Sequence, residues 1–242
     1  MIPHDQLDSL RVVLVATRNP LNIGAAARAM SNFGFLRLRV VQPFDLSFRE
    51  ARSAVGAPAL LQNAEVFSTV ADAVADCSLV VGTTAVGTRQ LEHSVHSLED
   101  GGPMIRTHLE SSRTALLFGS EKRGLSNDDL SYCHWLMRIP TRSEHDSMNL
   151  GQAVAVCLYE LIRAQALPSA APHTPTAQAS GEELDRMEHA LLEALAASGY
   201  TKPGTEAATQ EKARRLIRRL NLTSADAETL TGMLAKMRYR GK

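Results

Sequence analysis

The sequence of 242 residues predicts an α/β domain, a parallel sheet with helices on both faces, followed by a small all-α extension. Three observations lead to this fold class. Short runs rich in β-branched residues lack the alternation of a half-exposed strand, which is typical of strands buried on both faces. Ala-rich segments of helical periodicity separate these runs, as in a parallel sheet with crossover helices. From residue 181 onward only helical patterns remain.

The elements of the α/β domain follow from these runs and from capping signals. Asn22 can cap the start of the first helix, and Gly34 can end it. Ser126 starts a helix as part of a capping box, because an aspartate follows three residues later. Asp146 or Ser147 is expected to cap the last helix of the domain. The strands are expected at 11–17, 38–41, 78–84, 114–120 and 134–140, and the helices at 22–34, 68–77 and 149–165.

A change in composition divides the chain into three parts. Residues 166–180 are rich in Ala, Pro, Ser and Thr and carry no charge apart from His173, which is typical of linkers. We therefore expect a domain at 1–165, a linker at 166–180 and a helical extension at 181–242. The helices of the extension are expected at about 181–198, 206–221 and 224–238.

The second helix of the extension carries a concentrated positive charge. Helical periodicity places its arginines on one side and Leu216, Ile217 and Leu220 on the other. Such a face is compatible with solvation alone, with a membrane surface or with RNA phosphates. The extension lacks Trp and Phe, which disfavours the membrane. The four arginines are Arg214, Arg215, Arg218 and Arg219.

Composition excludes several classes of protein. The 26 basic and 26 acidic residues give zero net charge, so attraction to a nucleic acid must come from local patches. Three separated cysteines without a C-x-x-C pair indicate neither a disulfide framework nor a thiolate zinc site. HSVH at 93–96 lacks a third ligand, so we interpret it as a solvated loop and expect no metal. No apolar run could cross a bilayer and the N-terminus lacks a signal-peptide pattern, so we expect a cytoplasmic protein without a membrane partner.

Three stretches contain residues that the fold alone does not explain. NPLNIGAAARAM (19–30) places Arg28 among small residues. LLFGSEKRGLSNDDL (116–130) places Glu121 in a tight turn between glycines. RIPTRSEHDSMNLGQAVAV (138–156) joins a strand to a helix through a polar loop. Each alone is compatible with a surface arginine, an ordinary loop or a capped helix, and the G-x-G-x-x-G, P-loop and G-x-S-x-G fingerprints are absent.

Together, in this order and spacing, the three stretches resemble the motifs of the SPOUT superfamily of RNA methyltransferases, in its TrmH-like branch. The matching residues are Asn22 and Arg28, FGSEKRGL, and IP followed by SMN, and VVGTTA (80–85) also matches. The resemblance covers about the first 165 residues. Within the branch, the appended helices and the long IPTRSEHDSMNL stretch are most similar to tRNA 2′-O-methyltransferases that modify a pyrimidine at position 32 of the anticodon loop.

The resemblance implies a C-terminal trefoil knot in the sheet and S-adenosylmethionine as the cofactor, held largely by backbone groups of three loops. It also implies a homodimer, and we expect small residues of the helices at 22–33 and 149–165 at its interface. The implied cofactor-binding residues are Thr83, Thr84, Ala85, Gly119, Glu121, Ile139, Asp146, Ser147 and Met148. The implied catalytic residues are Asn22, Arg28, Glu121, Ser147 and Asn149.

Arg28 would face the target ribose and its phosphate, with the small residues around it allowing the RNA backbone to approach. The resemblance leaves a general-base role open, but stabilising the 2′-alkoxide or binding phosphate is physically easier for a guanidinium. Arg28 of one subunit would lie near the cofactor of the other. The four arginines of the extension would contact tRNA phosphates. A methyltransferase for ribosomal RNA and a non-catalytic RNA-binding module stay open as alternatives.

Overall fold

The computed structural model describes residues 4–44, 46–85, 93–142, 144, 147–163 and 177–238. Its centre is a seven-stranded sheet of order β3-β2-β1-β6-β4-β7-β5, and every pair of neighbouring strands is parallel. The expected α/β class with a parallel sheet is therefore confirmed. The strands are β1 (Leu10–Val15), β2 (Leu38–Val41), β3 (Glu65–Phe67), β4 (Leu79–Thr83), β5 (Val95–Ser97), β6 (Thr114–Phe118) and β7 (Trp135–Arg138).

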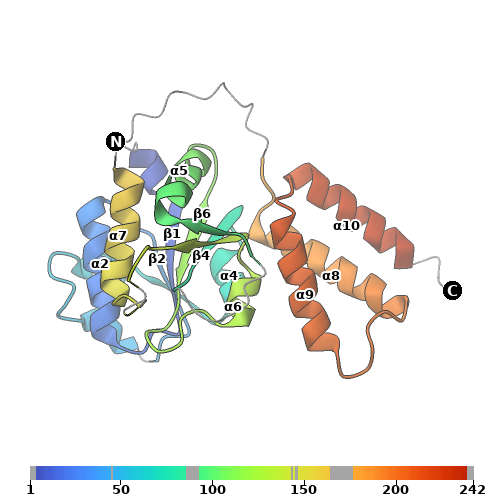
Figure 1. Cartoon of the computed structure of the whole chain (residues 1–242), viewed down its shortest axis with the longest axis horizontal. Coiled ribbons are helices and arrows are strands. Elements are labelled where there is room, and N and C mark those ends of the chain that lie inside the picture. Colours follow the sequence, from blue (N-terminus) through green and yellow to red (C-terminus); the bar gives the residue numbers. More distant parts are fainter. Residues whose placement is uncertain are drawn as a thin grey trace.

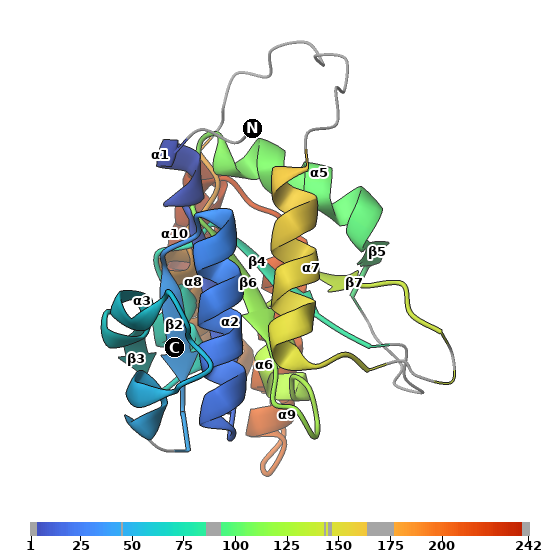
Figure 2. The same ribbon diagram turned by 90° about the vertical axis from the view of Figure 1, so that its left-hand side faces the viewer.

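Helices cover both faces of the sheet (Figures 1 and 2). Val12 and Leu14 of β1 belong to the core under α2, α5 and α7, whereas Val13 and Val15 belong to the core under α4 and α6. This split follows from the alternation of side chains along a strand. The helices of the domain are α1 (His4–Leu7), α2 (Pro20–Phe33), the 3₁₀ helix η1 (Leu46–Glu50), α3 (Pro58–Gln62), α4 (Val70–Val74), α5 (Leu98–Leu109), α6 (Asn127–Ser131) and α7 (Leu150–Ile162).

The caps of two helices differ from the sequence-based expectation. Asn19, not Asn22, caps α2, because its side chain accepts a hydrogen bond from the backbone N–H of Leu21 and Pro at the next position starts the helix. Asn149 caps α7, in place of Asp146 or Ser147. The expected capping box of α6 is confirmed, and so is the left-handed glycine that ends α2 at a φ of 81°.

Helix α5 was not expected from the sequence. Its middle contains Gly101, Gly102 and Pro103, which disfavour a helix interior. The glycines are tolerated because bulky side chains lie against them: a Cβ on Gly101 would come within 3.1 Å of the ring of Trp135. The helix is therefore fixed by packing, which local propensity does not report.

The small residues of α2 serve packing within the subunit. A Cβ on Gly24 would lie 2.2 Å from Oγ of Ser53, and a Cβ on Gly151 of α7 would lie 2.7 Å from that of Ala25. Helices α2 and α7 run side by side in both views (Figures 1 and 2), and most alanines of α2 are buried. These small residues therefore pack against the subunit's own helix and loop, and their expected roles in admitting RNA and at a dimer interface stay predictions.

The extension consists of α8 (Gly181–Ala197), α9 (Glu206–Arg219) and α10 (Ser224–Arg238), which pack around their own apolar cluster. It starts earlier than expected: Ala179 is buried and its N–H donates to the carbonyl of Leu222 at 2.9 Å. Residues 177–180 therefore belong to the extension, and residues 166–176 of the expected linker lie outside the described residues.

The extension lies against the face of the sheet that carries α4 and α6 (Figure 1). The N–H of Gly181 donates to the carbonyl of Cys77 at 2.7 Å, and that of Glu182 to the carbonyl of Ala75 at 2.9 Å. The expectation that residues 1–165 form a domain of their own stays a prediction. Among the described helices, none has the length and apolar character that a membrane span requires.

Candidate active site

A cavity of about 380 Å³ opens at the carboxyl ends of β4, β6 and β7. Ligands of open α/β sheets commonly bind at this edge, where loops leave the strands. The volume lies within the usual range for a small-molecule or cofactor site. The lining residues are Thr83, Thr84, Ala85, Phe118, Gly119, Ser120, Glu121, Lys122, Arg123, Gly124, Leu125, Leu130, Met137, Ile139, Thr141, Ser147, Met148, Leu150 and Ala153.

The loop after β6 folds back on itself beside the cavity. The N–H of Gly124 donates to the carbonyl of Ser120 at 2.8 Å, and Gly124 has a φ of 66°, which favours glycine. A Cβ on Gly119 would lie 2.0 Å from the carbonyl carbon of Gly124 and 2.1 Å from the N of Leu125. No side chain fits at Gly119, so the loop lines the cavity with backbone at this point.

Glu121 joins this loop to the starts of α2 and α7. Its Oε1 accepts a hydrogen bond from Nδ2 of Asn22 at 2.7 Å, and Oδ1 of Asn22 accepts one from Nδ2 of Asn149 at 3.1 Å. The backbone N–H groups of Arg18 and Asn19 also point to the carboxylate, at 3.4 Å each. Three segments that are far apart in the sequence are thus held by one carboxylate and two amides.

These contacts decide the protonation of Glu121. Burial would raise its pKa, but the hydrogen bond from Asn22 and those from backbone N–H groups outweigh burial and keep the pKa below its ordinary value of 4.5. Glu121 is therefore an ionised acceptor at neutral pH, so it orients groups and does not donate a proton.

We expect Glu121→Gln to show this linkage in its pH dependence. The folded pKa is lowered, so the stabilisation from the carboxylate is present above 4.5 and is lost as the pH falls through the folded value. The Tm of the wild type should exceed that of the variant most near neutral pH, and the difference should shrink below about pH 4.5. Thermal denaturation over this range measures it, and a Tm difference independent of pH would contradict the assignment.

The structure brings most of the expected cofactor residues to one place. Thr83, Thr84, Ala85, Gly119, Glu121, Ile139, Ser147 and Met148 all line the cavity. Asp146 lies outside the described residues. Of the other expected catalytic residues, Asn22 and Asn149 contact Glu121 or each other, as described above. The role of all these residues in binding a cofactor stays a prediction.

Arg28 occupies a different position from the other expected catalytic residues. It is exposed on α2 and is not among the residues that line the cavity. Within one subunit it therefore does not complete the site.

Sequence reasoning missed the apolar wall of the cavity. Leu130 of α6 and Ala153 of α7 contribute to it, as do Phe118 and Met137 at the ends of two strands. In the sequence these residues read only as core positions, because nothing local shows that a core position borders a cavity. Lys122 and Arg123 also line it, and their signal was present in the charged turn SEKRG.

The arginines of α9 do not form one exposed face. Arg214 and Arg218 are 7% and 1% exposed, whereas Leu216 and Leu220 are 47% and 49% exposed. The expectation that Arg214 and Arg218 contact phosphates is therefore wrong for this structure, because both guanidinium groups are paired with carboxylates inside the protein. Arg219 is exposed, and the half-buried Arg215 pairs with Glu211 within the helix.

The HSVH stretch is also not the solvated loop that we expected. His93 is 7% exposed, and residues Val95–Ser97 form the edge strand β5 beside β7. Across the parts of the chain that the structure describes, no three His, Cys, Asp or Glu side chains are grouped as metal ligands.

The fold and the cavity together define an α/β domain with a cavity of small-molecule size at the carboxyl edge of a parallel sheet, the usual place of a ligand site in this class of protein. The model of the SpoU rRNA methylase family matches residues 9–159, and the chain belongs to this family. The resemblance noted in the sequence is thereby confirmed.

The chain is similar to particular members over nearly its whole length. It is 33% identical over 241 residues to the tRNA (cytidine/uridine-2′-O-)-methyltransferase TrmJ of Citrobacter koseri, covering 98% of this chain and 99% of the relative. The crystal structure of TrmJ from Z. mobilis ZM4 superposes with a TM-score of 0.81 at 34% identity, covering 93% and 97% of the two chains. A structure described as giving insight into the 2-OH methylation of C/U34 on tRNA aligns with 65% of this chain and 96% of its own, at 26% identity and a TM-score of 0.51.

Proposed function

We propose that this protein transfers a methyl group from S-adenosylmethionine to the 2′-hydroxyl of a pyrimidine ribose in tRNA, at position 32 of the anticodon loop, in the cytoplasm. The observation that carries the proposal is similarity through both parts of the chain. The TrmJ enzymes match the extension as well as the domain. A relative that shared only the domain would support methyl transfer to RNA in general and no particular substrate.

The cavity fits the proposed cofactor on two grounds. Its volume of about 380 Å³ is sufficient for a ligand of this size class. Its wall combines apolar side chains such as Leu130 with bare backbone at Gly119, where a side chain is excluded. Backbone N–H and C=O groups at fixed places suit the edge of an adenine, and the apolar wall suits its faces. When bound, S-adenosylmethionine supplies an electrophilic methyl group on a sulfonium.

The protein's own contribution is to position and to stabilise charge. Glu121 is ionised and holds Asn22, which fixes the start of α2 beside the cavity. Asn149 holds the start of α7 to the same point through Asn22. A hydroxyl oxygen held in line for attack gains much of its reactivity from this positioning. Arg28 then acts as a cation that stabilises the forming alkoxide or binds the neighbouring phosphate.

We further propose that the active unit is a homodimer. Arg28 lies away from the lining of the cavity in its own subunit, so a second subunit is needed to bring an Arg28 to the target ribose. Leu21 and Tyr159, which are 55% and 52% exposed on α2 and α7, supply an apolar contact surface on these two helices.

Sedimentation should accordingly show a dimer at micromolar concentration. Tyr159→Glu should shift the protein towards monomer and lower activity, because a charge would be buried at the interface. Tyr200→Glu is the matched control, since this tyrosine is 69% exposed on the extension. Full activity of a strictly monomeric wild-type protein would contradict the proposed dimer.

Mapping of 2′-O-methyl groups and methyl transfer in vitro test the proposed substrate. Transfer RNA from cells with and without the gene is digested and its 2′-O-methyl groups are mapped, and purified protein is then incubated with the unmodified tRNA and labelled cofactor. Loss of a methyl group at position 32 in the deletion strain, restored in vitro, is expected. Loss of a methyl group from ribosomal RNA would favour a ribosomal RNA methyltransferase. RNA binding without any methyl transfer would favour a non-catalytic RNA-binding module.

Exposed cations of the extension should make salt-dependent contacts with tRNA. Arg219→Gln should weaken tRNA binding, and the slope of log affinity against log salt should fall by about 0.7–0.9, the value for one phosphate contact. Arg37→Gln is the control, because Arg37 pairs with Asp8 at 3.0 Å on the domain. An unchanged slope for Arg219→Gln would remove this residue from the RNA interface.

A further inference from the structure

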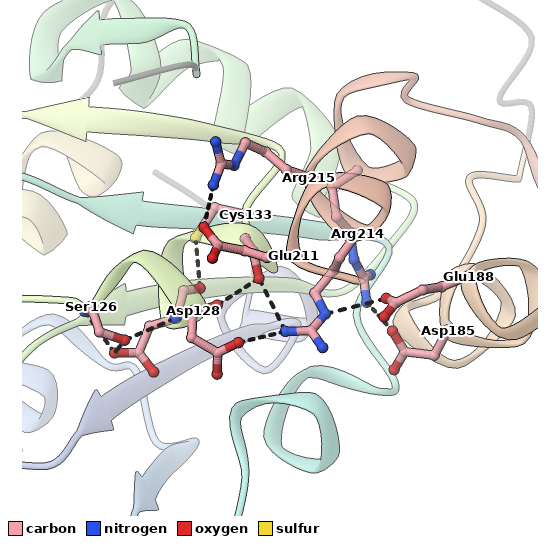
Figure 3. Close-up of polar contacts among 11 residues, drawn as sticks. Ser126, Asp128, Cys133, Asp185, Glu188, Glu211, Arg214 and Arg215 are labelled. Carbon is pink, nitrogen blue, oxygen red and sulfur yellow. Dashed lines mark hydrogen bonds and ion pairs between the residues drawn. The ribbon is translucent and has the colours of Figure 1, made fainter. Parts of the chain in front are cut away.

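Arg214 of α9 is buried between the extension and the domain (Figure 3). Its Nη1 donates to Oδ1 of Asp128 at 2.8 Å and to Oγ of Ser131 at 3.1 Å, and both partners belong to α6. Its Nε donates to Oε2 of Glu188 on α8 at 3.2 Å. The guanidinium carbon also lies 4.0 Å from the ring centre of Tyr132, the residue that follows α6. One side chain thus contacts two helices of different parts of the chain.

The carboxylates around Arg214 favour its charged form and hold it in place. Burial would lower the pKa of Arg214, but Glu188, Tyr132 and Asp128 together raise it above its ordinary value. Glu188 is itself buried, with 8% of its side chain exposed, whereas 74% of the side chain of Asp128 is exposed. The planar fork of an arginine presents five donors in a fixed geometry and can hold two carboxylates in defined directions, whereas the ammonium of a lysine is a compact point charge with three donors.

Arg218, one turn after Arg214 on α9, adds contacts within the extension beside the same junction. It is 1% exposed and its Nη2 donates to Oδ1 of Asp185 at 2.5 Å and to the carbonyl of Gly181 at 3.4 Å. Its guanidinium lies 5.8 Å from the same Tyr132 ring. Tyr132 is therefore near two guanidinium groups, at 4.0 and 5.8 Å, at the junction of α6 and α9.

Helix α6 connects this junction to the candidate active site. Leu130 lines the cavity, while Asp128 and Ser131 of the same five-residue helix contact Arg214. The N-cap of this helix, Ser126, follows the loop that carries Gly119 and Glu121. Because α6 borders both the cavity and Arg214, the contact that fixes α9 on α6 also fixes α9 relative to the cavity.

We propose that Arg214 is a positioning residue that holds the tRNA-binding extension in one orientation relative to the active site, through its contacts with Asp128, Ser131 and Tyr132. This inference rests on the proposed function in taking tRNA as the ligand of the extension. It assigns to Arg214 a role opposite to that of a phosphate ligand. The guanidinium of Arg214 is paired with carboxylates of the protein itself, and exposed cations nearby bind the RNA.

Asp128→Asn tests the proposal from the side of the domain. The change removes the one carboxylate of the domain that pairs with Arg214 among the described residues and leaves its pair with Glu188 in the extension intact. It affects an exposed side chain, so the domain should stay folded. We expect the KM for tRNA to rise about three- to tenfold, in line with the loss of one charged contact. The kcat at saturating tRNA and the cofactor Kd should change less than about twofold, as expected when uniform binding is lost. Glu110→Gln is the control for loss of an exposed carboxylate on the domain.

The sign of the effect separates the two roles of Arg214. For a positioning residue, Arg214→Met and Asp128→Asn raise the KM for tRNA in the same direction, and the double variant is no worse than Arg214→Met alone. For a phosphate ligand, Asp128→Asn removes a repelling charge and lowers the KM, while Arg214→Met raises it. Arg214→Lys should keep the KM of the wild type if only a charge is needed, and should raise it if the fork is needed.

A distance measurement tests the position without RNA. Spin labels at Ser111→Cys on the domain and Ala197→Cys on the extension can be attached selectively, because the three native cysteines are buried. The distance distribution should be narrow in the otherwise wild-type chain and broader with Asp128→Asn. An unchanged distribution together with an unchanged KM would overturn the proposal. If the wild-type protein never methylates tRNA but Asp128→Asn still broadens the distribution, the proposed function is overturned, and with it only the tRNA part of this inference.

Discussion

Gly119→Ala is expected to weaken cofactor binding strongly, and methyl transfer with it, by distorting the cofactor site. The added Cβ would lie 2.0 Å from the carbonyl carbon of Gly124 and 2.1 Å from the N of Leu125, so the loop after β6 must open. These contacts are with backbone, which cannot move aside as a flexible side chain can. Overpacking of this kind costs about 1–3 kcal/mol, which corresponds to roughly a 5- to 160-fold loss of cofactor affinity if the whole cost falls on the cavity.

Calorimetry with S-adenosylmethionine measures this prediction. The sheet should remain folded, since β6 ends at Phe118 before the strained position, and circular dichroism will check it. Gly232→Ala is the matched control, because a Cβ there meets nothing within 4 Å and the residue lies in α10. Unchanged cofactor affinity in Gly119→Ala would show that the loop after β6 does not form the cofactor site.

Arg28→Ala is expected to lower kcat by about 10²–10³, the effect of removing one group that stabilises transition-state charge. Cofactor affinity should change less than about twofold, because Arg28 is exposed on α2 and does not line the cavity. Arg28→Lys keeps a cation and should recover part of the loss if charge alone matters. If Arg28→Ala loses cofactor binding as completely as activity, the role assigned to this arginine is wrong.

Mixing the two variants tests whether subunits share the site. A heterodimer of Gly119→Ala and Arg28→Ala protomers contains one intact cavity that faces one intact Arg28. Random exchange makes half of the dimers mixed, so about a quarter of the wild-type activity should return. No recovery after exchange, with dimers confirmed by sedimentation, would place Arg28 and its cavity in the same subunit.

The sequence by itself determined the elements whose signals are local. Residues Leu38–Val41 form the expected strand, the capping box at Ser126 forms as expected, and the three helices of the extension lie close to their expected bounds. The loops of the cavity were also found, because their motifs match a family to which the chain belongs. The trefoil knot stays a prediction, since nothing in strand or helix patterns reports how the chain threads.

The tertiary structure decided which of several possible residues takes a given role, and whether a segment with weak local signals forms a helix. Asn19 caps α2 while Asn22 contacts Glu121, although both asparagines are possible caps in the sequence. Helix α5 forms across Gly101 and Gly102 because other side chains pack against these glycines. In each case the deciding partner lies far away along the chain.

The arginines of α9 show the physical reason most clearly. Periodicity correctly places Arg214 and Arg218 on one side of a helix, but it carries no information about what lies opposite. Asp128 is 86 positions from Arg214 in the chain, and their pairing converts an expected RNA-binding face into an internal contact. The same stripe of arginines is compatible with solvent and with carboxylates that neutralise it, so only the three-dimensional arrangement distinguishes the two.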